Sequence, residues 1–158
     1  MEAQTAVSTI RLTAPLTGVM VPIELVPDPV FAKKMVGEGF SIDPLNNELV
    51  APIAGEVADL QPSGHAITIR SAEGLEVLMH IGLDTVKMAG QGFTPHVREG
   101  DQVQLGDSLI TFDLDMVATN AKSALTQVVI ANSERVAELS PRTGLVTAGS
   151  DVAAEITL

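Results

Sequence analysis

The stretch Gly64–Ile81 reads GHAITIRSAEGLEVLMHI. Two runs rich in β-forming residues, His65–Arg70 and Leu75–Ile81, flank a short polar connection that ends in Gly74. Apolar and β-branched runs on either side of a short glycine-containing loop are typical of a β-hairpin. The stretch therefore predicts two antiparallel strands.

The register of this hairpin decides where its two histidines lie. If Ser71–Gly74 forms the loop, His65 lies directly opposite His80, and a two-residue loop at Ala72–Glu73 gives the same pairing. Opposed residues have Cβ atoms about 4.5–5.5 Å apart on one face of the sheet. Both rings could then address one group, whereas a three-residue loop would place them on opposite faces.

The rest of the chain is divided into short segments by thirteen glycines and nine prolines. Short β-rich runs at regular spacing, with turn residues between them, are typical of an all-β sandwich or barrel. We therefore expect an all-β, antiparallel β-sandwich or barrel. Further strands are expected at Glu48–Pro52, Glu56–Leu60, Ser108–Phe112, Thr126–Ile130 and Val152–Leu158.

An Ala-Pro-x-x-Gly frame occurs at Ala14–Gly18 and Ala51–Gly55, and Ser140–Gly144 echoes it. Proline ends a hydrogen-bonded ladder and glycine turns the chain, so each copy predicts a strand, a corner and another strand.

Helical signals are few, and we expect only one or two short connecting helices. Asp113 is a candidate N-cap for a helix over Leu114–Ala121, and Asn132 or Ser133 for a short turn through Leu139. Val30–Gly39, enclosed by proline and glycine, is expected to be a loop.

Composition narrows the classes of function. The 158 residues suit one domain. Nine basic and twenty acidic residues give a net charge of −11, which disfavours binding to nucleic acid or to an anionic membrane surface. Cysteine is absent, which excludes thiol chemistry within this chain.

Met1–Leu12 lacks the pattern of a signal peptide, and no stretch approaches the roughly 20 apolar residues of a spanning helix. We expect a cytoplasmic protein with no stable membrane insertion.

The histidines carry the clearest chemical signal, because two of only three fall in one hairpin. Of two adjacent neutral imidazoles, one can act as a nucleophile and the other as a donor, or both can bind a metal. They could also be ordinary polar residues on a solvent-facing strand. His96 follows a proline and is expected in a surface loop, whereas Asp84 lies near His80 as a rim charge or supporting partner.

Several motifs together resemble the glucose-type IIA component of the bacterial phosphoenolpyruvate-dependent sugar phosphotransferase system. The most specific is His80–Val86, His-Ile-Gly-Leu-Asp-Thr-Val, with the upstream Gly64-His65-Ala66. Gln91 stands where the family usually has Glu. The other matching stretches are Val26–Phe31, Met35–Gly39, Val50–Gly55, Gly90–Phe93, Glu99–Leu109 and Phe112–Leu114.

The resemblance implies a sandwich of the duplicated hybrid motif type, as one domain over 14–158 preceded by a short flexible leader over 1–13. It implies that His80 accepts a phosphoryl group from phosphohistidine on the carrier HPr and passes it to a cysteine of a IIB domain, for uptake by the IIB/IIC permease. His65 would stabilise that phosphoryl group, and Ser63, where the family usually has Thr, would support His65.

The resemblance also implies a surface for these partners. Val30, Phe31, Val36 and Leu78 would form its apolar part, and Asp28 and Asp84 its acidic rim. No cofactor or metal is required, although His65 and His80 could share a regulatory zinc ion with a partner. Regulated permeases or kinases are further partners that the family implies.

Two other classes share parts of these motifs. His80–Asp84 spells the His-x-x-x-Asp of a LytM-type zinc metallopeptidase, but that class also needs a His-x-His pair, which the three histidines do not form. Biotinyl and lipoyl carriers share the Gly-Asp string of Glu99–Leu109 and present a lysine at a hairpin tip. Lys87 directly follows the histidine motif and is better explained as a solvated side chain.

Overall fold

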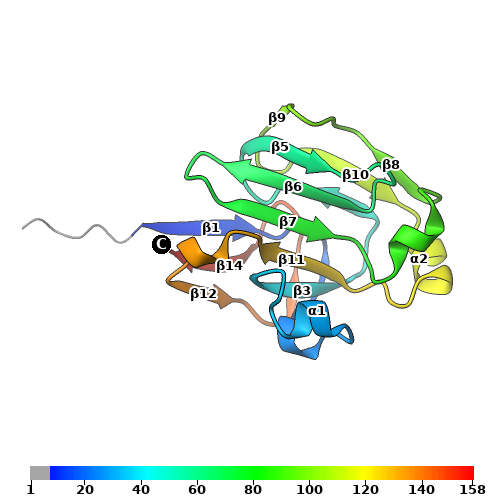
Figure 1. Ribbon diagram of the computed structural model, residues 1–158, viewed down its shortest axis with the longest axis horizontal. Coiled ribbons are helices and arrows are strands. Elements are labelled where there is room, and N and C mark those ends of the chain that lie inside the picture. Colours follow the sequence, from blue (N-terminus) through cyan, green and yellow to red (C-terminus); the bar gives the residue numbers. More distant parts are fainter. Residues whose placement is uncertain (1–7) are drawn as a thin grey trace, which may run out of the picture.

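The predicted hairpin lies inside the largest sheet of the fold. The computed structural model describes residues 8–158, and in it the hairpin strands are β6 (Ala66–Ser71) and β7 (Glu76–His80). The other strands of this sheet are β2 (Gly18–Pro22), β3 (Glu38–Pro44), β5 (Gly55–Leu60), β9 (Gln102–Val103), β11 (Thr126–Ile130) and β13 (Leu145–Val146). Their order is β13-β2-β3-β11-β7-β6-β5-β9. Figure 1 shows the part of this order from β3 through β11, β7, β6 and β5 to β9.

Two smaller sheets complete the sandwich. One has the order β1-β14-β12 and the other β4-β10-β8, and every strand pair among residues 8–158 is antiparallel. Their strands are β1 (Thr9–Thr13), β14 (Val152–Thr157), β12 (Glu138–Pro141), β4 (Glu48–Val50), β10 (Ser108–Phe112) and β8 (Phe93–Pro95). Within this part of the chain the large sheet ends in β13 and β9 and does not close into a barrel.

Helical segments are short and connect strands. They are η1 (Ile23–Leu25), α1 (Pro29–Ala32), η2 (Thr85–Met88), α2 (Leu114–Asn120) and η3 (Ser133–Arg135). Among residues 8–158, no helix has the length and apolar character needed to span a membrane.

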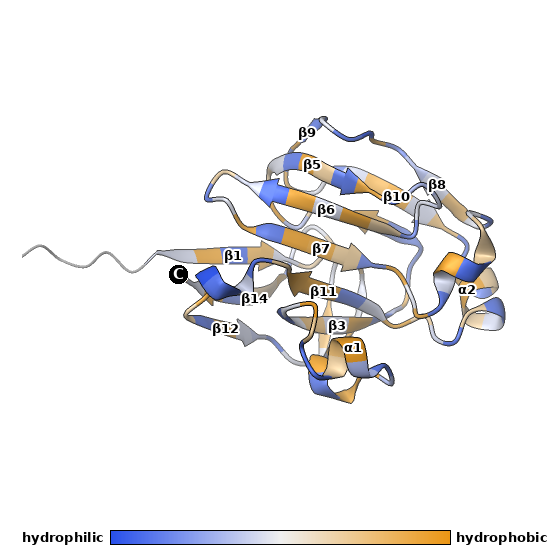
Figure 2. Ribbon diagram, viewed as in Figure 1, coloured by the Kyte–Doolittle hydropathy of each residue, from blue (hydrophilic) through white to orange (hydrophobic). Residues whose placement is uncertain are grey.

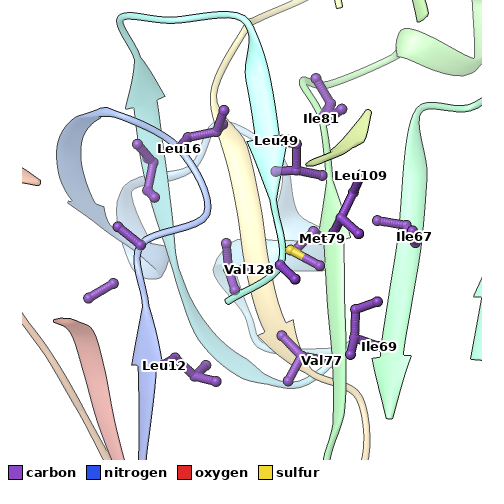
Figure 3. Close-up of a cluster of buried hydrophobic side chains, with 14 of the residues drawn as sticks. Leu12, Leu16, Leu49, Ile67, Ile69, Val77, Met79, Ile81, Leu109 and Val128 are labelled. Carbon is purple, nitrogen blue, oxygen red and sulfur yellow. The ribbon is translucent and has the colours of Figure 1, made fainter. Parts of the chain in front are cut away.

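Alternation along the strands produces the core. In β7, Val77 and Met79 are buried and Leu78 and His80 are half-buried, so the two sets lie on opposite faces. The inward residues meet those of the smaller sheets in one apolar cluster that includes Leu12, Leu49, Ile67, Ile69 and Leu109 (Figure 3). Figure 2 shows apolar and polar residues following one another along strands such as β6 and β7. The histidine of β7 is therefore directed away from the main core.

The structure confirms the all-β sandwich and each of the predicted strands to within two residues at either end. The three Pro-Gly frames are corners as predicted: they join β1 to β2, β4 to β5, and β12 to β13. The helix predicted after Asp113 is α2, and Oδ1 of Asp113 accepts a hydrogen bond from the Met116 amide at 3.0 Å.

The predicted hairpin register is wrong by one residue. His80 pairs with Ala66 and not with His65, because the loop has three residues, Ala72–Gly74. The Ser71 amide donates to the Leu75 carbonyl at 2.9 Å, and Gly74 has a φ of 89°. A glycine in the left-handed region at the end of a three-residue loop is a favoured hairpin geometry, which explains this register.

The predicted leader over 1–13 is also too long. Thr9–Thr13 form β1, which pairs with β14, so these residues belong to the sandwich. The Ser8 carbonyl accepts a hydrogen bond from the Leu158 amide at 3.0 Å, and residues 1–7 of that predicted segment lie outside the described residues.

Two local predictions need smaller corrections. The turn expected from Asn132 to Leu139 stops at Arg135, and Leu139 belongs to β12. The side chain of Asn132 binds the Glu76 amide and the Gly74 carbonyl instead of capping a helix. The loop expected over Val30–Gly39 begins in α1 and ends in β3, a central strand that its flanking glycines concealed.

Candidate functional site

His80 is the last residue of β7 and lies on the outer face of the large sheet. Its Nδ1 atom is 2.8 Å from the carbonyl oxygen of Gly82. A carbonyl can only accept a hydrogen bond, so Nδ1 carries the proton of the neutral ring. The lone pair is consequently on Nε2, which makes Nε2 the nucleophilic atom.

The acceptor carbonyl is held by a tightly fitted turn. Gly82 has a φ of 72°, and a Cβ atom there would lie 2.6 Å from Cγ2 of Thr85 and 2.8 Å from the Ser123 carbonyl oxygen. The hydroxyl of Thr85 donates to the Ile81 carbonyl at 2.7 Å, and the Leu83 amide to the Ser123 carbonyl at 2.9 Å. These bonds fix the backbone on both sides of Gly82.

His65 reaches His80 by a route other than the predicted one. The two ring centroids are 5.0 Å apart and the ring planes meet at 79°. His65 lies in a bend before β6, after Gly64 with a φ of 76°, so the alternation of strand faces does not govern its side chain. The backbone of His65 is still bonded to the end of β7, because the His65 carbonyl accepts a hydrogen bond from the Ile81 amide at 2.8 Å. The two histidines come together although the register that predicted it is wrong.

Ser63 and Phe93 also contact His65. The Ser63 hydroxyl is hydrogen-bonded to Nδ1 of His65, and the Phe93 ring centroid is 6.4 Å from that of His65. When the hydroxyl donates to Nδ1, the proton of the neutral ring is on Nε2. In that tautomer His65 has a donor available for an anionic group.

Electrostatics favour the neutral form of both rings. Burial lowers the pKa of His80, and the hydrogen bond to Gly82 and the charge of Asp28 only partly oppose this effect. Burial also lowers the pKa of His65, and repulsion by a charged His80 lowers it further. His65 is 6% exposed, which agrees with burial as the main cause. Both imidazoles are therefore available as neutral bases near neutral pH.

An apolar surface adjoins the histidines. The Phe31 ring centroid is 5.4 Å from that of His80, and Phe31 belongs to a second buried cluster on the outer face of the sheet, with Ile23, Val26, Leu83 and Val129. Val36 and Leu78, two of the predicted docking residues, are half-buried against this cluster, and Val30 is exposed on α1.

The two predicted rim carboxylates have different local roles. Asp28 caps α1, because its Oδ1 accepts a hydrogen bond from the Val30 amide at 2.9 Å, and its charge acts on His80. Asp84 is exposed, adopts a left-handed φ of 62° and lies 3.7 Å from Nζ of Lys87. Of these two carboxylates, Asp28 is the one whose charge raises the pKa of His80.

Sequence reasoning missed some features of the site. It included Gly82 in the histidine motif but gave no role to its carbonyl, which accepts from His80. It also gave no signal that three apolar side chains, Leu25 of η1, Met35 after α1 and Val86 of η2, are exposed. An isolated apolar residue in a loop gives no signal of exposure, so only their high exposure in the structure reveals them.

His96 is exposed, as predicted, and its Nε2 is 2.7 Å from the Thr111 hydroxyl. Among residues 8–158, no group of three or more histidine, cysteine or carboxylate side chains is arranged to hold a metal ion. Lys87 lies in η2 and not at a hairpin tip, which differs from the position that a biotinyl or lipoyl carrier uses.

Comparison with known proteins identifies the family. The family model described as phosphoenolpyruvate-dependent sugar phosphotransferase system, EIIA 1, matches residues 10–136. The chain belongs to this family. It is thus a component of a sugar phosphotransferase system with a role in transferase chemistry.

Individual relatives support this family assignment. The chain is 52% identical over 124 residues to the PTS system glucose-specific EIIA component of Halalkalibacterium halodurans, covering 78% of this chain and 72% of the relative. It is 49% identical over 131 residues to that of Staphylococcus aureus, covering 83% and 79%. Among solved structures, the glucose permease IIA from Mycoplasma capricolum matches with a TM-score of 0.87 and 33% identity over 94% of this chain and 96% of the other.

Proposed function

We propose that the protein is a phosphoryl carrier in which Nε2 of His80 is the atom that is phosphorylated. The observation that carries this is the 2.8 Å hydrogen bond from Nδ1 to Gly82, which leaves the Nε2 lone pair free beside His65. The donor is a phosphohistidine on HPr. The Nε2 lone pair forms a bond to phosphorus while the P–N bond of the donor breaks, and the donor nitrogen keeps that electron pair.

His65 and Ser63 stabilise the transferred group. Phosphoryl transfer depends mainly on positioning and on charge stabilisation. With the Ser63 hydroxyl donating to Nδ1, the Nε2–H of His65 donates to a phosphoryl oxygen on His80. Ser63 therefore acts by selecting the tautomer of His65.

The onward step requires a partner, since the chain contains no cysteine. A thiolate of a IIB domain attacks the phosphorus, the P–N bond to His80 breaks, and Nε2 regains its lone pair. The apolar residues Val30, Phe31, Val36 and Leu78 exclude water on docking, and Asp28 and Asp84 attract basic residues of HPr and of the IIB domain. The permease IIB/IIC then couples the transfer to sugar uptake. A carrier supplied from phosphoenolpyruvate works where that metabolite is made, so we place the protein in the cytoplasm.

Both histidines also fit a zinc ion shared with a partner. Nε2 of His80 has a free lone pair, because Nδ1 donates to the Gly82 carbonyl. Nε2 of His65 becomes a second ligand when the ring proton moves to Nδ1 and the Ser63 hydroxyl accepts from it, and the partner would supply the remaining ligands. Such an ion would link two proteins and would block Nε2 of His80. Regulated permeases or kinases are the partners for which we propose it.

Labelling with phosphoenolpyruvate and the general carriers tests the proposal. We expect an acid-labile phosphohistidine at His80, no label in His80→Ala, and a His65→Gln variant that accepts phosphate but passes it on poorly. His96→Gln is the matched control and should be labelled like the wild type. Label on His65 or His96 that spares His80 would overturn the assignment. A lasting biotinyl or lipoyl adduct on Lys87 in the mass of the expressed protein would instead favour the carrier-module class.

A further inference from the structure

Lys34 occupies a backbone position that suits glycine. The amide of Lys34 donates to the Phe31 carbonyl at 2.9 Å and that of Met35 to the Val30 carbonyl at 3.0 Å, which together form a Schellman motif at the end of α1. The residue in the left-handed position of this motif is usually glycine, and Lys34 holds it with a φ of 59°. A residue other than glycine that is kept in a strained backbone conformation often has a functional side chain.

The ammonium group of Lys34 joins three segments. Nζ lies 3.2 Å from Oε2 of Glu24 in η1 and 3.2 Å from Oε1 of Glu38, the first residue of β3. Hydrogen bonds to these two carboxylates raise the pKa of Lys34, so its ammonium group stays charged. We call Lys34, Glu24 and Glu38 together the clamp. The side chain of Lys34 is about one-third exposed, at 36%, so the pairs are partly screened by solvent.

The segment Val26–Met35, which lies between Glu24 and Glu38 of the clamp, is attached to the sheet in few ways. From Val26 to Met35, the backbone hydrogen bonds that the structure describes are all made within residues 23–35. The attachments left are the apolar cluster that contains Phe31 and the ion pairs of Lys34. Phe31 lies against His80, at 5.4 Å between ring centroids, so a shift of this segment changes the environment of the reactive ring.

We propose that Lys34 is a positioning residue, which holds Phe31 over His80 through its ion pairs with Glu24 and Glu38 and so limits the access of water to phosphorylated His80. The inference rests on the proposed function of His80. It assigns to Lys34 a role in keeping the phosphohistidine intact between partners, because a ring that is covered on one side presents less of the N–P bond to water.

Four variants separate this role from a structural one. Lys34→Gly removes the ion pairs and also the strain of the left-handed conformation, and Lys34→Met removes the ion pairs alone. Lys34→Arg keeps the charge. Lys33→Met is the matched control, because Lys33 is exposed and forms none of the ion pairs found among residues 8–158.

The first measurement is the half-life of phosphohistidine at neutral pH, followed by ³¹P NMR after the general carriers are removed. We expect Lys34→Gly and Lys34→Met to shorten it roughly threefold, the order that an exposed ion-pair network can supply. Lys34→Arg and Lys33→Met should keep the wild-type half-life. A Lys34→Gly protein with the wild-type half-life would overturn the inference.

A second measurement does not depend on phosphorylation. The ring resonances of His80 in the unphosphorylated protein should shift in Lys34→Gly and Lys34→Met and stay in place in Lys33→Met. Unchanged ring resonances in both Lys34 variants contradict the positioning role. Failure of the wild type to be labelled at His80 contradicts the proposed function instead, and the ring resonances still show whether the clamp positions Phe31.

Discussion

Replacing Gly82 with alanine should impair both the stability and the chemistry of this protein. Gly82 has a φ of 72°, where an L-residue costs about 1–2 kcal/mol. The new Cβ would also lie 2.6 Å from Cγ2 of Thr85 and 2.8 Å from the Ser123 carbonyl oxygen. Relief of such crowding by backbone movement costs about 1–3 kcal/mol more. We expect the free energy of unfolding to fall by about 2–5 kcal/mol in total.

The same movement should displace the carbonyl that accepts from Nδ1 of His80. A hydrogen bond of this kind contributes about 0.5–1.5 kcal/mol net, so its loss should slow phosphorylation of His80 by about twofold to tenfold. The tautomer with the proton on Nδ1 should become less populated, which ¹⁵N NMR of the imidazole detects directly.

Gly100 provides the matched control. Its φ of 92° is also left-handed, but a Cβ there would have no heavy atom of the described chain within 4 Å. Gly100→Ala should therefore lose only the conformational part, about 1–2 kcal/mol, with normal phosphorylation. Urea denaturation gives the two stabilities, and labelling at a fixed HPr concentration gives the rates. Equal losses of stability in the two variants, together with equal labelling rates, would show that the close fit at Gly82 plays no part.

Further expectations concern the two histidines. Because burial lowers the pKa of His65 and His80 below the ordinary 6.5, their contribution to stability should be complete above about pH 6.5 and decline as the pH falls through the lower folded-state values. Urea midpoints from pH 8 to 5 should show this decline in the wild type and much less of it in a His65→Gln, His80→Gln double variant; parallel curves would contradict it. Ser63→Ala should slow transfer from phospho-His80 to the IIB domain by about twofold to tenfold, and Ser63→Thr, which keeps a hydroxyl, should not. Equal transfer rates in the two Ser63 variants would remove that residue from the mechanism.

Local sequence signals predicted much of the fold. The runs that became β5, β6, β7, β10, β11 and β14 are β-rich and bounded by turn residues, and the capping side chain of Asp113 marks the start of α2. Such features depend on residues close in the chain. Strand β3 was missed for the same reason: Gly37 and Gly39 look like loop residues locally. In the structure a Cβ on Gly39 would lie 2.1 Å from the Val128 carbonyl oxygen, so glycine allows close contact with a neighbouring strand.

The candidate site likewise has residues that the sequence indicates and contacts that only the structure shows. The sequence singled out His80 and His65, because histidine is scarce and the Gly-His and His-x-Gly-x-Asp-Thr motifs are specific, whereas Ser63 was proposed from the family resemblance. It placed the apolar residues and Asp28 near the site only through the family resemblance, and Asp84 through its position after His80 in the chain. The contact of Phe31 with His80 and the clamp at Lys34 depend on how the segment after η1 packs on the outer face of the sheet.

The amino-acid sequence by itself determined an acidic, cysteine-free β-sandwich with two histidines in one hairpin. Only the tertiary structure decided the register and the working geometry. Loops of two, three or four residues are compatible with the letters around Gly74, and the structure has the three-residue loop in which Gly74 takes the left-handed conformation. His65 meets His80 through a bend after Gly64, and Gly82 accepts from His80 because its turn is bound to Ser123. Of these contacts only the bond of Leu83 to Ser123 joins segments distant in sequence, and it holds the local turn in which Gly82 accepts from His80.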